Sequence, residues 1–136
     1  MIVLDTTVVS EPLRPRPNLA VVEWVAERRA EAELTSVTMG ELLYGAQRLP
    51  DGKRKRGLLE AIADLSGSVP ILPYDGPASA AYSDLRAERE SIGLAGSIED
   101  LMIAGICLVG GHQLATRNVK DFAGTGVDII NPWSRG

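Results

Sequence analysis

Short apolar runs alternate with longer amphipathic segments along this chain. The apolar runs have the length and composition of strands and cover residues 2–4, 33–37, 69–73, 113–116 and 127–130. Apolar side chains at helical spacing predict helices over residues 18–29, 38–49, 55–65, 75–91 and 98–109. This alternation predicts an α/β fold in which helices cover both faces of a central, mostly parallel, five-stranded sheet.

The carboxyl edge of such a sheet is the expected place for a functional site. In open parallel sheets, ligands bind beyond the carboxyl ends of the strands, near the point where the strand order reverses. Asp5 directly follows the first predicted strand, and the Thr116-Arg117-Asn118 turn lies at the end of the fourth. We therefore expect these residues to lie at or near the site.

Length and composition indicate one compact domain over residues 1–136, with 45% hydrophobic residues for its core. The single cysteine, Cys107, permits no intrachain disulfide, and the start of the chain lacks the pattern of a signal peptide. The longest apolar stretch, residues 98–111, contains two acidic residues and is too short to span a bilayer. These features predict a cytoplasmic protein without a membrane segment.

Several kinds of chemistry are excluded by missing residues. His112 is the only histidine, so no two-histidine metal motif is possible, and neither a P-loop nor a dinucleotide-binding glycine motif is present. Cys107 lies within the most apolar predicted helix, where a thiol is usually an inert core residue. What remains is carboxylate chemistry.

Four acidic residues follow strands or lie near helix starts: Asp5, Glu41, Asp100 and Asp121. Each also has a purely structural explanation. Asp5 could cap the turn after its strand, Glu41 could complete a capping box that begins at Thr38, and Asp100 one that begins at Ser97. Asp121 could be an ordinary loop carboxylate.

Taken together, the four carboxylates favour a divalent cation. A parallel sheet brings strand ends and helix starts to one edge, where clustered carboxylates repel one another and lose water. Mg²⁺ binds oxygen ligands, typically takes one or two carboxylates and keeps several waters. The net charge of −4 counts against a nucleic-acid substrate unless a bound metal inverts the local charge. A metal-bound water beside such carboxylates is suited to phosphodiester hydrolysis.

The chain resembles PIN-domain toxins of the VapC and FitB group. The similar segments keep the family's order along nearly the whole chain: MIVLDTTVVSEP at 1–12, ELLYG at 41–45, DLMIA at 100–104, LATRNVKDF at 114–122 and NPW at 131–133. No single segment is decisive, but the ordered set is highly specific. The resemblance implies a PIN-like three-layer α/β/α fold.

The resemblance also implies a Mg²⁺-dependent endoribonuclease, with Mn²⁺ as a possible alternative ion, which acts as the toxin of a type II toxin–antitoxin system. A cognate antitoxin and a homodimer are the implied partners. The implied metal contacts are Asp5 and Asp100, and the implied catalytic set is Asp5, Glu41, Asp100 and Asp121. The polar residues expected to contact RNA are Thr6, Thr116, Arg117 and Asn118.

Two departures from the family pattern affect the site. Thr7 stands where the family usually has Asn or another small polar residue, although a hydroxyl can still hydrogen-bond a metal-bound water. Asn118 occupies a position where some relatives carry Asp, which leaves Asp121 as the acidic candidate for the fourth position.

Two other functions remain open from the sequence. A phosphatase with an aspartyl nucleophile would also place Asp5 after the first strand, but it normally needs a second Asp where Thr7 stands. A non-catalytic module could use the acidic pocket to bind a partner or a regulatory cation.

Three further features bear on the partners. The basic run of residues 53–56 could contact RNA through charge or be an exposed helix start. Trp24 and Trp133 are better explained as packing anchors than as base-stacking platforms. Residues 13–25 and 55–65 carry apolar stripes that could form a groove for an antitoxin segment, and core packing explains the same stripes.

Overall fold

A computed structural model describes residues 1–94 and 96–134 and contains one five-stranded sheet. Its strands are β1 (Ile2–Leu4), β2 (Ala32–Thr35), β3 (Ile71–Leu72), β4 (Gln113–Ala115) and β5 (Ile129–Ile130). They lie in the order β3-β2-β1-β4-β5, and every neighbouring pair is parallel. The predicted five-stranded parallel sheet is therefore confirmed. The strand order reverses beside β1, which is the central strand.

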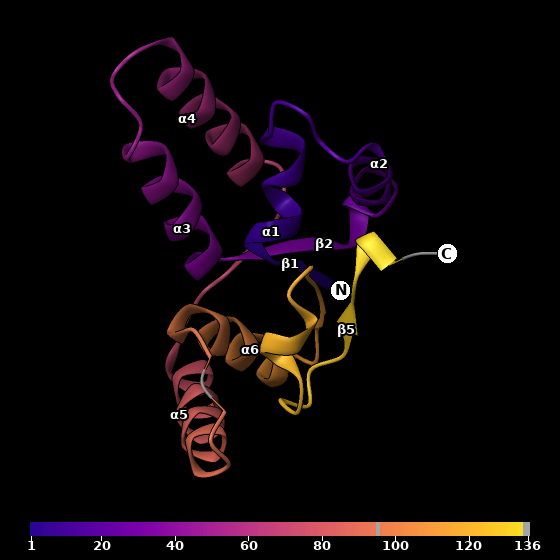
Figure 1. The fold of residues 1–136 in the computed structure, drawn as a ribbon, viewed down its shortest axis with the longest axis vertical. Helices are drawn as coiled ribbons and strands as arrows, with labels where there is room; N and C mark the ends of the chain where they lie inside the picture. The colour runs from indigo at the N-terminus through magenta and orange to yellow at the C-terminus, as the bar shows by residue number, and fades with distance from the viewer. Residues whose placement is uncertain (95, 135–136) are drawn as a thin grey trace.

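Helices cover both faces of this sheet (Figure 1). They are α1 (Thr6–Val9), α2 (Leu19–Glu27), α3 (Ser36–Gln47), α4 (Lys53–Ser66), α5 (Gly76–Ser91) and α6 (Ile98–Gly110). Short 3₁₀ helices are η1 (Glu11–Leu13), η2 (Arg29–Glu31), η3 (Val119–Phe122) and η4 (Pro132–Ser134). In Figure 1, α1 to α4 lie on one side of the strands, and α5 and α6 lie on the other. The predicted three-layer α/β/α architecture is confirmed.

Alternating side chains of β1 divide the core into two parts. Ile2 and Leu4 pack into one cluster with residues of α1 to α4, whereas Val3 packs into a second cluster with residues of α5 and α6. Successive residues of a strand point to opposite faces, and both faces are apolar here because both are covered. The central strand is therefore buried throughout.

The middle of helix α6, from Leu101 to Cys107, is mostly buried, as its apolar composition predicts, whereas Ile98 at its start and Leu108 and Val109 at its end are exposed. Gly105 brings α6 close to α5, because a Cβ atom there would lie 2.6 Å from the carbonyl oxygen of Ala78. Within the described residues, no helix combines the length and apolar character needed to cross a membrane.

Helix α3 begins two residues earlier than the sequence pattern predicts. Thr35, not Thr38, is the N-cap residue, and its Oγ1 accepts a hydrogen bond from the Thr38 N–H at 3.0 Å. Two threonines three residues apart can both serve as caps, and Thr35 takes this role because it ends β2 with an extended backbone and the helix begins at the next residue. Glu41 therefore lies in the second turn of the helix, and the predicted capping box is wrong.

Candidate active site

The chain places the predicted acidic residues at the carboxyl edge of the sheet, beside its central strand. Asp5 follows β1 directly, and Asp100 lies in the first turn of α6. Glu41 extends from α3, and Asp121 belongs to η3, which follows β4. Parallel strands β1 and β4 are hydrogen-bonded neighbours, so segments far apart in sequence meet at this edge.

Asp5 is held by two hydroxyl groups rather than by a helix end. Its side chain is 2% exposed, and its Oδ2 accepts hydrogen bonds from Thr116 Oγ1 at 2.8 Å and Thr7 Oγ1 at 3.1 Å. Asp5 occupies the N-cap position of α1, yet its carboxylate makes no capping bond. The capping explanation for Asp5 is therefore wrong. Among the described residues, no side chain or N–H donates to Oδ1, which leaves that oxygen for a ligand.

Glu41 is anchored to the same region through Thr6. Thr6 Oγ1 donates a 2.8 Å hydrogen bond to Glu41 Oε1 and joins α1 to α3. Loss of solvent raises the pKa of Glu41, the Thr6 hydrogen bond opposes this, and the nearby charge of Asp5 raises it further. The Glu41 carboxylate thus contacts Thr6 and lies near Asp5, and does not cap the start of its own helix.

Asp100 is the most strongly perturbed of these carboxylates. Burial, followed by the charge of Asp5, raises its pKa to about 6. The Ser97 hydroxyl lowers the pKa, while the charges of Asp121 and Glu41 raise it further. Ser97 also caps α6 through the Asp100 N–H at 3.0 Å, as the sequence suggests. The charges that act on Asp100 are all carboxylates, so the predicted residues lie within one another's electrostatic reach.

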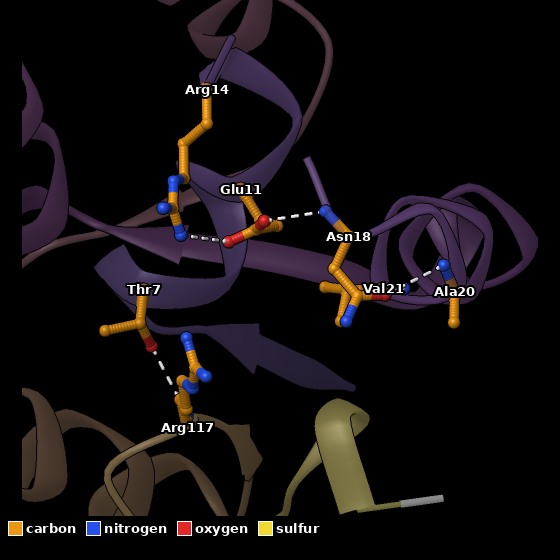
Figure 2. A network of polar contacts seen from close by, with 7 residues as sticks. All are labelled: Thr7, Glu11, Arg14, Asn18, Ala20, Val21 and Arg117. Carbon is orange, nitrogen blue, oxygen red and sulfur yellow. Dashed lines mark hydrogen bonds and ion pairs between the residues drawn. The ribbon is translucent and has the colours of Figure 1, made fainter. Parts of the chain in front are cut away.

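The turn after β4 supplies the polar residues of the rim. Thr116 is buried, and besides donating to Asp5 it accepts the Asn118 N–H at 3.0 Å. The Arg117 N–H donates to Thr7 Oγ1 at 3.3 Å (Figure 2). The side chains of Arg117 and Asn118 are exposed. The predicted substrate-binding residues are thus brought to the acidic cluster, with Thr6 on its other side.

Glu11 is a buried acidic residue that the sequence interpretation missed. It is 2% exposed and accepts hydrogen bonds from the Asn18 N–H at 2.8 Å and from Arg14 at 3.1 Å (Figure 2). The Asn18 N–H bond lowers the pKa of Glu11 most, burial opposes it, and the charges of Arg14 and Arg117 lower it further. Nothing in the local pattern distinguishes Glu11 from an exposed loop residue.

The carboxylate cluster suits a hydrated divalent ion better than a closed metal cage. No group of three or more Asp, Glu, His or Cys side chains in the described ranges is arranged to hold a metal on its own. Mg²⁺ needs only one or two protein carboxylates, because water completes its octahedral shell. Burial and then the charges of neighbouring carboxylates raise the pKa of Asp100, and a bound cation would offset both effects. Asp5 and Asp100 therefore fit such an ion.

Cys107 offers no alternative chemistry. It is buried in α6, and burial raises the pKa of its thiol to about 12. The thiol is therefore protonated at neutral pH and cannot act as a nucleophile. The prediction of an inert core cysteine is confirmed.

An apolar groove opens beside the acidic residues. Its volume is about 350 Å³, and it runs from Thr6 and Glu41 between α3 and α4 toward Leu13, Leu58 and Arg54. A second cavity, of about 300 Å³, is lined by Leu13, Val25 and Leu65 among others. The apolar stripes of residues 13–25 and 55–65 thus leave open space as well as forming core.

Comparison with known proteins agrees with this architecture. The family model described as PIN domain matches residues 2–126. The chain is 38% identical to the VapC ribonuclease Y4jK of Sinorhizobium fredii, over 98% of each chain. It is 36% identical to the toxin FitB of Neisseria gonorrhoeae, over 98% of this chain and 99% of that protein.

A solved structure extends the likeness to three dimensions. The crystal structure of FitAcB from Neisseria gonorrhoeae superimposes with a TM-score of 0.89 at 35% identity, covering 99% of this chain and 100% of that one. The match of the PIN model to almost the whole chain, together with relatives above one third identity over full length, establishes the family. This chain belongs to the PIN domain family.

Proposed function

We propose that this protein is a metal-dependent endoribonuclease and the toxin of a toxin–antitoxin pair. The observation that carries the proposal is the gathering of Asp5, Glu41, Asp100 and Asp121 at the carboxyl edge of the sheet. Besides burial, the charges of the other three carboxylates raise the pKa of Asp100. Similarity to a VapC ribonuclease and to the FitB toxin supports RNA as the substrate and a toxin as the biological role. Similarity to a solved structure of FitAB supports a cognate antitoxin. A homodimer and a cytoplasmic location are further parts of the proposal.

Asp5 and Asp100 are the proposed metal-holding residues, with Mg²⁺ as the preferred ion and Mn²⁺ as the alternative. The ion would supply an acidified water and neutralise charge on the phosphate. Thr7 and Thr116 orient Asp5 by donating to its Oδ2, which leaves Oδ1 without a hydrogen-bond donor among the described residues. The charge of Asp121 reaches Asp100, which favours Asp121 over Asn118 as the fourth acidic residue.

Glu41 is the proposed proton acceptor. Its Oε1 is occupied by the Thr6 hydroxyl, so Oε2 is the oxygen positioned to accept a proton from the attacking water. The raised pKa of Glu41 makes it a stronger base than an ordinary exposed carboxylate. Arg117 and Asn118, exposed on the rim, are placed to bind the phosphate backbone.

Replacement of single carboxylates tests the proposal. We expect D5N and D100N each to lower the rate of Mg²⁺-dependent cleavage of a structured RNA by about 100-fold or more, because either change removes a metal contact. D84N is the matched control, since Asp84 is an exposed carboxylate on α5 and its loss should leave the rate unchanged. Full activity in both D5N and D100N would overturn the mechanism.

The same assay separates the other functions. A binding module would take up Mg²⁺ in calorimetry without cleaving RNA. An aspartyl phosphatase would form a trapped phospho-enzyme, which mass spectrometry detects at Asp5. RNA cleavage that requires Mg²⁺ or Mn²⁺ and stops with EDTA is the outcome that we expect.

A further inference from the structure

Arg117 and Trp133 follow neighbouring strands and meet at the rim of the acidic site. β4 and β5 are parallel partners, and Arg117 lies two residues beyond β4 while Trp133 lies three residues beyond β5. The guanidinium carbon of Arg117 lies 5.0 Å from the centroid of the Trp133 ring. This distance is within the range of a cation–π contact.

The Trp133 ring is fixed by its own turn. Asn131 Oδ1 accepts the Trp133 N–H at 3.0 Å, and the buried Pro132 restricts the backbone between them. The ring is half-buried and packs against the core cluster on the α1–α4 side of the sheet. Trp133 is thus a packing anchor, as predicted, and its position is set before any ligand arrives.

Arg117 is held by its backbone N–H and by the contact of its guanidinium with the Trp133 ring, and neither contact uses a side-chain N–H donor. Its backbone N–H bonds to Thr7, which itself donates to Asp5. Its charge reaches Glu11, yet Arg14 is the residue that pairs with that carboxylate. Within the described part of the chain, the guanidinium of Arg117 forms no hydrogen bond or ion pair.

A second arginine–tryptophan pair in the same chain provides a contrast. Arg28 lies 4.5 Å from the Trp24 ring, but its Nη1 also donates to the Trp24 carbonyl and to Glu27, both at 3.3 Å. The Nη1 group of Arg28 is therefore engaged by acceptors of α2. Arg117 differs because stacking uses only the face of the guanidinium and leaves its in-plane N–H groups free, in the geometry that binds phosphate oxygens bidentately.

We propose that Trp133 is a positioning residue that holds the Arg117 guanidinium beside the acidic site, ready to bind a phosphate of the RNA backbone. The inference rests on the proposed function for the identity of the ligand. A flexible arginine loses side-chain freedom when it binds, and an aromatic platform that restricts the side chain beforehand reduces that cost. Trp133 therefore acts on RNA only through Arg117.

A double-mutant cycle with R117A and W133L tests this coupling. Steady-state cleavage gives kcat and KM, and anisotropy of a fluorescent RNA in EDTA gives Kd without cleavage. We expect R117A to weaken RNA binding about tenfold, and W133L to weaken it about threefold, which corresponds to an exposed cation–π contact. In the R117A background, W133L should cause no further loss, because the residue it positions is gone. The effect should appear in KM more than in kcat.

Conservative changes separate positioning from folding. W133F keeps an aromatic face and should restore binding to near the wild-type value. N131A keeps the ring but removes the bond that fixes its turn, so it should weaken binding only when Arg117 is present. R28A is the matched arginine control and should leave RNA affinity unchanged. Thermal unfolding of each variant checks that the fold persists.

The outcomes distinguish this inference from the nuclease proposal. Equal losses from W133L with and without Arg117, or no loss in either background, would overturn the positioning role even if the protein cleaves RNA. Absence of cleavage in Mg²⁺ and Mn²⁺ would overturn the nuclease, while coupled losses in the EDTA binding cycle would still support the positioning role.

Discussion

At the residue scale, the burial of Asp5 makes its hydroxyl partners important for stability as well as activity. Thr116 Oγ1 donates to Asp5 Oδ2 at 2.8 Å, and both residues are buried. We expect T116V to lower the free energy of unfolding by about 1–3 kcal/mol, because a buried charged acceptor loses a donor. T116S keeps the donor and should retain most of the stability. Urea unfolding of both variants measures the difference, and equal stability of T116V and wild type would contradict this account.

The pKa of Asp100, raised from its ordinary 3.8 to about 6, predicts how stability depends on pH when no metal is bound. A carboxyl group whose pKa is raised in the folded state binds its proton more tightly there than in the unfolded chain. Its contribution to stability is thus fully present below about pH 4 and is lost as the pH rises through about 6. D100N removes this charge.

In EDTA at pH 7.5, we therefore expect D100N to melt about 3 °C above wild type, an effect kept small because Asp100 is only partly buried. At pH 4 the two proteins should melt together, since Asp100 is then protonated. Thermal unfolding at both pH values measures this, and a lower melting temperature for D100N at pH 7.5 would show that the carboxylate stabilises the fold.

Sequence patterns identified site residues that directly follow strands or begin helices. They missed residues whose role depends on a contact with a residue far away in the sequence. Asp5 and Asp100 could be singled out because an acidic residue beside an apolar segment is locally unusual. Glu33 was placed in a strand but given no role, although it is buried and its Oε1 lies 3.0 Å from His112 Nδ1. That contact spans three strands, so only the register of the sheet brings the pair together.

At the element scale, the packing of α6 on α5 depends on Gly105. A Cβ atom there would lie 2.6 Å from the Ala78 carbonyl oxygen and 3.1 Å from the Tyr82 nitrogen, and these backbone atoms cannot move without separating the helices. We expect G105A to lower the free energy of unfolding by about 1–3 kcal/mol or more. G57A is the matched control: Gly57 lies within α4 with open space around it, so alanine should raise stability by about 0.5–1 kcal/mol.

Chemical denaturation measures the free energy of unfolding of the two alanine variants. It tests whether α6 has glycine at position 105 because α5 lies so close there. Loss of stability in G105A together with a gain in G57A supports close approach. Similar gains in both variants would mean that α5 and α6 can separate at no cost.

Long elements were predicted well because their apolar periodicity extends over several turns, whereas short ones carry too few residues to show a period. Helices α5 and α6 begin and end within one residue of the predicted bounds. Helix α1 was missed, since its four residues include two valines and two threonines, which favour strands when considered alone. Strand β3 pairs over only two residues, where the apolar run predicted five.

At the scale of the whole molecule, the strand order was the information that the sequence could not supply. Alternating strands and helices predict a parallel sheet, but they do not say which strands are neighbours. The placement of β1 beside β4 joins Asp5 to Thr116, 111 residues later in the chain.

A molecule with a net charge of −4 must overcome repulsion to bind RNA. If a cation at Asp5 and Asp100 inverts the local charge, RNA affinity should depend on divalent metal. We expect Ca²⁺, which oxygen clusters bind in a looser geometry than Mg²⁺, to lower the Kd for a fluorescent RNA about tenfold relative to EDTA. The double variant D5N/D100N should show little of this gain, which separates a bound ion from general screening of RNA phosphates. Anisotropy at fixed ionic strength, with gels to confirm intact RNA, measures both proteins. Equal tightening in the double variant would place the metal effect on the RNA rather than on the acidic cluster.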